Sequence, residues 1–473
     1  MMIQRDVYKF GGSSQKDAAA LENCIDLLVR DDHPKAVIVS APSEVTNLLI
    51  AGAEKHFDGE KVPQEFYRMK QRYMDIFHRI PGAVQVIDEK YESLLRNAFG
   101  SKTKFSLEQQ PFHYTYIVSF GERLEERLFP LHLRLHGLPA KTIPARHIFK
   151  LSGDSRNATY NRRSDALIQE AYANPDILPI TGGFHGSDEQ GNVLLFSRGG
   201  SDYTQTLVAR AIHARACYNC TDVPGIYPID PKLFSADERQ QLEREGKLRP
   251  IPFLSYQEAQ ELAKQGAKVI HPQALDVLVD DEITFYVLNT FAPGAGMTEI
   301  GSLKDPTPRV TGITGKKGPF HSISLRSGEM EDSSGYLSFV GEAFSGVNVE
   351  TITTSRVGIG VGFSDPKADL ERLTSHLAQR GRVEQHNDSS FIALVGINLG
   401  KDPNILAQFF STLAREKIPV GQVSKMSSNF SSEGTSADFS LWAEVPVKDY
   451  ERAQKALYFS MVLREPHLSN FSI

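Results

Sequence analysis

Two glycine-rich bends in the sequence each follow an apolar, strand-like run and could bind an anion. In NVLLFSRGGSDYTQTLVARA, residues 192–211, the run ends in Arg198, Gly199, Gly200, Ser201 and Asp202, and a helical pattern follows. Adjacent glycines allow positive φ angles and close approach of a ligand, while a helix start offers free N–H groups. The bend is therefore a candidate anion site. An ordinary strand–turn–helix corner, with Ser201 or Asp202 as N-cap, explains it equally well.

The second bend lies near the start of the chain. KFGGSSQKD places Lys9 beside Gly11, Gly12, Ser13 and Ser14, directly before the helical pattern AAALENCIDLLVR. Amides, hydroxyls and an ammonium group together suit phosphate oxygens. The spacing is not that of the Walker loop, G-x-x-x-x-G-K-[ST], and Lys9 taken alone is also consistent with a surface lysine.

Further polar residues stand at the ends of other strand-like runs. VSAPSEVTNLL, SFGERL, TDVPGIYPIDPK and GAKVIHPQAL contribute Ser40, Thr46, Glu122, Asp222, Asp230, Lys268 and His271. Ligands of open α/β sheets bind at the carboxyl ends of the strands, so these clusters predict one shared crevice. Turn capping is the alternative role for the two aspartates, and we interpret His271 as a structural loop residue.

The elements that must position these residues alternate between short β-branched runs and helical patterns from residue 3 to about 290, which predicts an α/β fold with a mostly parallel sheet. Within this region, residues 58–110 are polar and helix-rich and indicate a helical insertion. A Gly/Pro-rich break follows. Residues 310–363 and 388–445 then each run strand, helix, strand, strand, a weak internal repeat of one small α+β unit. The predicted boundaries are 1–295, a linker at 296–309, 310–386 and 387–473.

The composition of the chain restricts the classes of function that it can have. The chain has 473 residues, of which 40% are hydrophobic and 23% charged, and its formal net charge is −6, so nucleic acid is not an expected partner. We find no signal-peptide, transit-peptide or membrane-span pattern, which favours the cytoplasm. Three cysteines, Cys24, Cys217 and Cys220, cannot build a disulfide framework, and we interpret them as structural and expect no metal site.

In this order, the segments resemble the amino-acid kinase superfamily and, specifically, the aspartate kinases. KFGGSS resembles that family's Lys-Phe-Gly-Gly-Thr-Ser, SFGE its Ser-x-Gly-Glu, and ITGGFHG, SRGGSDYT, TDVPGIYPIDP and ELAKQGAKVIHP its remaining landmarks. The paired units with VNVETITTS resemble its regulatory ACT domains. The resemblance covers nearly the whole chain. It implies a three-layer kinase domain over 1–295, followed by two ferredoxin-like ACT domains.

The resemblance implies a reaction and a set of roles. ATP, with Mg²⁺, would phosphorylate the side-chain carboxylate of L-aspartate, the first step toward lysine, threonine and methionine. Lys9, Arg198 and Asp202 would be catalytic, Arg198 also binding the α-carboxylate and Asp202 holding Lys9. Ser40, Thr46, Glu122 and Ser201 would complete the substrate shell, with Glu122 on the α-ammonium. The nucleotide would lie against Lys9, Gly11, Gly12, Ser13, Thr221, Asp222, Tyr227, Lys232 and Lys268.

Regulation is also implied, by an amino acid that binds the ACT domains. MEDSSGYL and VNVETITTSR resemble the effector site of lysine-sensitive enzymes and give Met330, Ser333, Tyr336, Leu337, Val349, Glu350, Thr354 and Ser355. Arg356 replaces an acidic residue there, so lysine is only modestly favoured, unless Arg356 turns to solvent. A homodimer through the ACT domains is expected, or a tetramer.

Three smaller departures and two alternatives accompany this interpretation. Ser197 replaces a glycine, Ser13 a threonine, and Lys232 an arginine near the nucleotide. The alternatives are a kinase for another amino-acid carboxylate and a non-catalytic ACT sensor of amino acids. The charged set of Arg198, Asp202 and Glu122 argues against the first, and the presence of every cation and acid that the reaction needs argues against the second.

We predict that Arg198→Lys mainly raises the KM for aspartate, because a point ammonium cannot reproduce a bidentate contact with a carboxylate. Initial rates at varied aspartate and saturating ATP measure this. An unchanged KM would place the α-carboxylate elsewhere.

Overall fold

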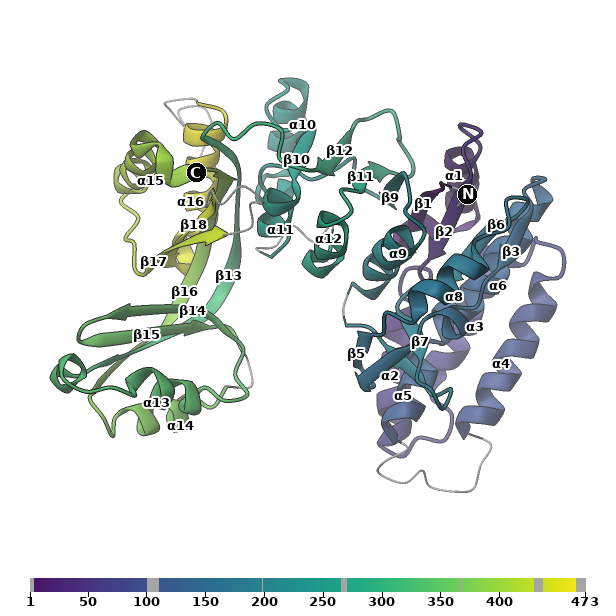
Figure 1. Ribbon diagram of the computed structural model, residues 1–473, viewed down its shortest axis with the longest axis horizontal. Coiled ribbons are helices and arrows are strands. Elements are labelled where there is room, and N and C mark those ends of the chain that lie inside the picture. Colours follow the sequence, from purple (N-terminus) through teal and green to yellow (C-terminus); the bar gives the residue numbers. More distant parts are fainter. Residues whose placement is uncertain are drawn as a thin grey trace. The chain divides into compact units, whose positions relative to one another are not determined.

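The computed structural model describes residues 4–99, 110–197, 199–264, 270–365, 368–428 and 437–464 (Figure 1). The chain divides into two compact units. The first comprises Met1–Ile226, Pro250–Gln260 and Lys268–Leu303, and the second comprises Tyr227–Arg249, Glu261–Ala267 and Lys304–Ile473. Among the helices of the described residues, none combines the length and hydropathy required for a bilayer span.

An eight-stranded sheet forms the centre of the first unit, in the order β10-β12-β11-β9-β1-β2-β6-β3. Its strands are β1 (Asp6–Phe10), β2 (Lys35–Val39), β3 (Ala140–Thr142), β6 (Leu178–Gly182), β9 (Ala216–Thr221), β10 (Phe253–Ser255), β11 (Thr284–Asn289) and β12 (Met297–Gly301). Neighbouring strands run parallel except β11 and β12. The prediction of a mostly parallel sheet is confirmed, and β12 lies within the stretch that we expected to be a linker.

Alternation along β1 directs its side chains to opposite faces of the sheet. Tyr8 and Phe10 join the large core cluster under the helical layer on one face. Lys9 must therefore point to the other face, where α9 (Gly200–Ala211) contacts β1, β2 and β9. The expectation that the cysteines are structural fits their burial: all three are free thiols with no exposed surface.

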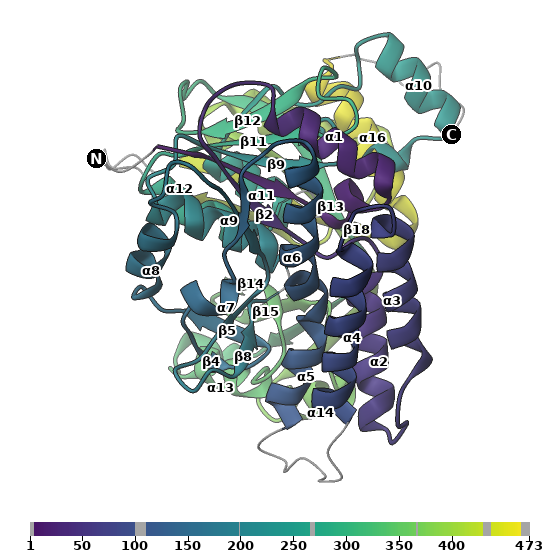
Figure 2. The same cartoon turned by 90° about the vertical axis from the view of Figure 1, so that its right-hand side faces the viewer.

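Helices cover both faces, and α2, α3 and α4 run beside α6 in one layer (Figure 2). This layer contains α1 (Ala18–Leu28), α2 (Val45–Phe57), α3 (Gln64–Phe77), α4 (Ala83–Phe99), α5 (Gln110–Val118) and α6 (Phe120–Leu135). The other helices of this unit are α7 (Ala145–Ile148), α8 (Ser164–Ala171), α9 and α12 (Pro272–Val279), and the 3-10 turn η1 is Gly12–Gln15; α11 (Tyr256–Lys264) is divided between the two units. Two hairpins complete it, β4 (Leu151–Asp154) with β5 (Asn157–Tyr160), and β7 (His185–Ser187) with β8 (Val193–Leu195). Both α3 and α4 lie inside the stretch predicted as a helical insertion.

A six-stranded antiparallel sheet forms the second unit, in the order β14-β15-β13-β16-β18-β17. The strands are β13 (Arg309–Arg326), β14 (Val349–Ser355), β15 (Gly358–Phe363), β16 (Arg382–Ile397), β17 (Val423–Ser428) and β18 (Ala437–Pro446). The helices are α10 (Ala236–Arg244), α13 (Tyr336–Ala343), α14 (Leu370–Leu377), α15 (Pro403–Arg415) and α16 (Tyr450–Leu457), with short turns η2 (Pro231–Leu233), η3 (Gly328–Glu331), η4 (Leu399–Lys401), η5 (Val447–Asp449) and η6 (Tyr458–Val462). The order strand, helix, strand, strand occurs twice, as predicted.

The two repeats share their long strands. β13 pairs with β16 along nearly its whole length, with irregular register between Lys316 and Ser322. Before this irregularity, the β16 partners of residues 312–316 also pair with β18; after it, β13 pairs with β15. The first strand of the first repeat therefore also contributes to the half-sheet of the second repeat.

Candidate active site

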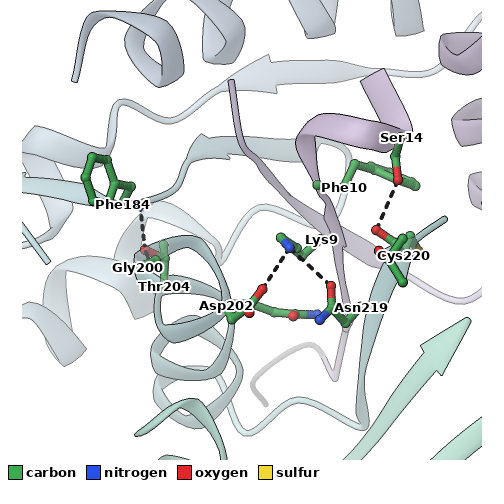
Figure 3. Close-up of polar contacts among 12 residues, drawn as sticks. Lys9, Phe10, Ser14, Phe184, Gly200, Asp202, Thr204, Asn219 and Cys220 are labelled. Atoms are coloured by element: carbon green, nitrogen blue, oxygen red, sulfur yellow. Dashed lines mark hydrogen bonds and ion pairs between the residues drawn. The ribbon is translucent and has the colours of Figure 1, made fainter. Parts of the chain in front are cut away.

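Lys9 is the centre of a polar cluster on the α9 face of the first unit's sheet. Its Nζ lies 2.7 Å from Asp202 Oδ1 on α9 and donates to Asn219 Oδ1 on β9 at 3.2 Å (Figure 3). The side chains of Lys9 and Asp202 are both 12% exposed. A cation so poorly hydrated needs partners, and here two elements fix its position.

The glycine turn after β1 brings backbone close to Lys9. A Cβ atom on Gly11 would lie 3.4 Å from Lys9 Nζ, and one on Gly12 would lie 2.8 Å from the carbonyl oxygen of Ala41. A side chain at Gly12 is thus excluded by backbone. Ser14 anchors the turn from beneath by donating to the Cys220 carbonyl at 3.1 Å and bonding Thr290 Oγ1 at 2.6 Å.

The helix α9 starts at the second glycine bend. Gly199 is its N-cap, with φ of 79° and no side-chain capping bond. The assignment of Ser201 or Asp202 as N-cap is therefore wrong, because both residues already lie in the first helical turn and Asp202 is paired with Lys9. The first N–H groups of α9 carry no side-chain cap, which suits an anionic ligand. Close packing holds this bend, since a Cβ on Gly183 would meet Ser201 Oγ at 2.6 Å.

Glu122 lies at the start of α6 and is 3% exposed. Its Oε1 accepts from the Ala41 amide at 3.3 Å and from Thr46 Oγ1 at 3.5 Å, while its Oε2 has no hydrogen-bond partner. Burial raises the pKa of Glu122 to about 7. An ammonium ligand would favour the ionised form and supply the missing partner.

The other predicted residues are distributed as follows. Ser40 and Ser13 are half-buried, and the Ser40 amide donates to the Phe10 carbonyl at 3.1 Å next to the glycine turn. At the end of β9, Thr221 Oγ1 donates to the exposed Asp222 at 3.2 Å.

Four further predicted nucleotide- and substrate-binding residues stay predictions. Tyr227, half-buried against an apolar cluster, and the exposed Lys232 belong to the second unit. Arg198 and Lys268 lie outside the described residues. His271, interpreted as structural, is the N-cap of α12 and packs so closely that a Cβ on Gly199 would meet its Cβ at 2.3 Å.

Two further polar residues of the candidate site, Asn219 and Glu126, were not predicted from the sequence. Asn219 lies directly opposite Lys9 in the parallel register of β1 and β9. In the sequence, Asn219 is a single amide residue between Cys217 and Cys220. Only its pairing with Lys9 shows that it belongs to the site. Glu126, one turn after Glu122, accepts from the amides of Ala145 and Gly182 at 3.2 and 3.3 Å, and burial raises its pKa to about 7.

In the second unit, the residues of the predicted effector site surround α13 and β14. Ser333 and Tyr336 line one pocket, together with Glu329 and Arg380. Thr354 and Ser355 line a different, polar groove on the sheet. Among the remaining four, Met330 lies in η3, Val349 and Glu350 begin β14, and Leu337 on α13 is 58% exposed. The eight residues are thus not gathered in one cavity of a single chain.

Comparison with known proteins decides the family. The model of the amino acid kinase family matches residues 4–289. The lysine-sensitive aspartokinase 3 of Escherichia coli K12 is 30% identical over 419 residues, which are 86% of this chain and 90% of that protein. The chain belongs to the aspartokinases of the amino acid kinase family.

Two solved structures of an aspartokinase support this assignment. Aspartokinase III of E. coli in complex with aspartate and ADP is 26% identical and has a TM-score of 0.77, covering 96% of this chain and 99% of that one. The same enzyme in complex with lysine and aspartate is 27% identical with a TM-score of 0.72, covering 97% and 99%. The fold class predicted from the sequence is confirmed.

We predict that Lys9→Ala lowers kcat by about 10²–10³, because removing one preorganised donor to developing charge costs this much. Turnover measured at saturating substrates, with thermal unfolding to verify the fold, tests the role. Lys16→Ala, an exposed lysine on the same segment, is the matched control and should be unaffected. Full turnover in a folded Lys9→Ala variant would remove Lys9 from the mechanism.

Proposed function

We propose that this chain transfers the γ-phosphoryl group of ATP to the side-chain carboxylate of L-aspartate and forms 4-phospho-L-aspartate. The observation that carries the proposal is Lys9, fixed between Asp202 and Asn219 beside a glycine turn, in a chain of the aspartokinase family.

The electrostatic problem of this reaction matches the cluster. A carboxylate with an ordinary pKa of about 4 is ionised at neutral pH and needs no general base. It must, however, approach an anionic triphosphate. Lys9 supplies a fixed positive charge, and the glycine turn after β1 allows phosphate oxygens to approach the backbone amides. Asp202 keeps Lys9 in place. Gly12, whose surroundings exclude a side chain, fits this role.

Magnesium would enter with the nucleotide. Mg²⁺ usually keeps several waters and binds through substrate phosphates, where it neutralises charge as the phosphoryl group moves. We assign it no protein ligand. Lys9, Gly11, Gly12 and Ser13 would hold the phosphates that carry it.

The residues around Glu122 would recognise aspartate. Glu122, buried and with one unpartnered oxygen, would bind the α-ammonium. Ser40, Thr46 and Ser201 would add hydroxyl contacts, and Arg198 the bidentate contact with the α-carboxylate. Thr221, Asp222, Tyr227, Lys232 and Lys268 would serve the nucleotide.

A coupled assay of ADP release tests the reaction. We expect ADP to form with L-aspartate and ATP–Mg²⁺, and not with L-glutamate or N-acetyl-L-aspartate, because the first is one methylene longer and the second has lost the ammonium group that Glu122 would hold. Release of ADP with another amino acid, and not with L-aspartate, would indicate a kinase for a different carboxylate. No release with any of them would indicate a sensor without catalysis.

For regulation, we propose that an amino acid, with lysine favoured, binds the second unit and inhibits by shifting a two-state equilibrium. Arg356, the departure from the lysine-sensitive pattern, is 84% exposed and pairs with Glu331 at 2.7 Å. It is therefore turned to solvent, the condition under which it opposes lysine least. Glu350, by contrast, is paired with Lys316 and Ser364, so an effector ammonium would compete with Lys316.

We also propose that a second copy of the chain completes the effector site. The predicted residues divide between a pocket and a groove, and β14 is an edge strand with a free side. Around it, Leu337, Ile352 and Val357 are 58%, 53% and 44% exposed. Apolar side chains beside an unpaired strand edge favour an interface. A homodimer through this edge brings two such sites together.

We predict that lysine inhibits ADP release and that Glu350→Gln raises its half-inhibitory concentration roughly 10- to 100-fold, the usual worth of a charge-assisted hydrogen bond. Titrations with lysine, threonine and methionine, singly and together, measure this. Glu342→Gln, an exposed acid on α13, is the control. Inhibition by threonine alone would exclude the lysine preference, and no response to any of the three would exclude the regulatory proposal.

A further inference from the structure

One cluster of metal-ligating side chains lies apart from the Lys9 cluster. Glu22 on α1, His132 on α6 and His136 at the C-cap of α6 place one donor atom each within 4.8 Å of one another. The Nε2 atom of His132 lies 3.6 Å from Glu22 Oε1, and that of His136 lies 3.5 Å from Glu22 Oε2. Among the described residues, this is the single group of three or more such side chains with this spacing.

The arrangement follows from helix geometry. His132 and His136 are four residues apart, so they stand one turn apart on the same face of α6. The glutamate comes from another helix of the same layer, and Leu21 and Leu133, adjacent to the ligands in sequence, belong to one buried core cluster. The three side chains therefore project from a packed scaffold, the condition for a preorganised site.

The burial of His132 also indicates a ligand at this position. The residue is 5% exposed, and neither of its ring nitrogens has a hydrogen-bond partner. Leaving a buried polar group without a partner costs folding free energy. A cation between the three donors would satisfy the Nε2 atom.

We propose that Glu22, His132 and His136 bind a divalent transition-metal ion, and we take Zn²⁺ as the reference ion. Imidazole and carboxylate suit zinc, nickel or copper, whereas magnesium prefers oxygen ligands alone. Three protein donors leave a fourth position for water. The side chains of Glu22 and His136 are 55% and 37% exposed, which gives the ion a path from solvent.

The site joins helices and does not take part in phosphoryl transfer. His132 lies ten residues after Glu122 on α6, a separation of about 15 Å along the helix at 1.5 Å per residue. Zinc bound there would tie α1, which follows the glycine turn, to the end of α6. Because the metal binds only the folded arrangement, it would raise the stability of the first unit.

The test uses the full chain, stripped of metal by a chelator and titrated with Zn²⁺ alone in a calorimeter. We expect one equivalent to bind and to raise the midpoint of thermal unfolding. We expect Glu22→Gln and His136→Ala each to weaken this binding by at least about 100-fold, more than the loss of an outer-shell group costs. Both replaced side chains are partly exposed, so the variants should fold, and their metal-free unfolding midpoints verify it.

The matched control is His78→Ala, which removes an exposed histidine from the C-cap of another helix, α3. It should bind Zn²⁺ like the wild type. Co²⁺ should bind competitively and give visible absorption in the wild type and in His78→Ala only, while Mg²⁺ in excess should not displace it. Absence of zinc binding by the wild type, or equal binding by folded Glu22→Gln and His136→Ala variants, would overturn the proposal.

Discussion

The ion pair between Lys9 and Asp202 is the interaction on which the arrangement of the active site depends. Lys9 alternates with Tyr8 and Phe10, which pack into the core on the opposite face of the sheet, so its side chain has only the α9 face available and must find its partners there. Asp202 in the first turn of α9 and Asn219 on the adjoining strand provide them. The pair thus sets the position of the helix start relative to the glycine turn, and the two candidate anion sites meet at one ammonium group.

The main elements of this site could be predicted from the sequence because each is a local pattern. Lys9 with two glycines, Glu122 at a helix start, and Asp202 after a glycine bend are each visible within a few residues. The mostly parallel sheet followed from alternating strand and helix patterns. The paired strand–helix–strand–strand order of the second unit was readable in the same way.

The rest depends on contacts between residues distant in sequence. Asn219 becomes a partner of Lys9 only through the register of β1 with β9, across about two hundred residues, and no spacing rule gives that register. Asp202 was misassigned as a cap because a short acid before a helical pattern resembles an N-cap, while Gly199 starts the helix through its positive φ. The pairing of Glu350 with Lys316 likewise joins β14 to β13, which share no local motif.

The sharing of β13 and β16 between the two halves of the second unit's sheet has a mechanical consequence. A domain that ends where a repeat ends can be removed as a unit, but these two halves share continuous backbone, because β13 and β16 run through both. β14 pairs with β15, β15 with β13, β13 with β16 and β16 with β18, so hydrogen-bonded strands connect the β14 edge to β18. A single proteolytic cut at the boundary between the halves would sever only one of the two shared strands, and the other strand would still join the halves.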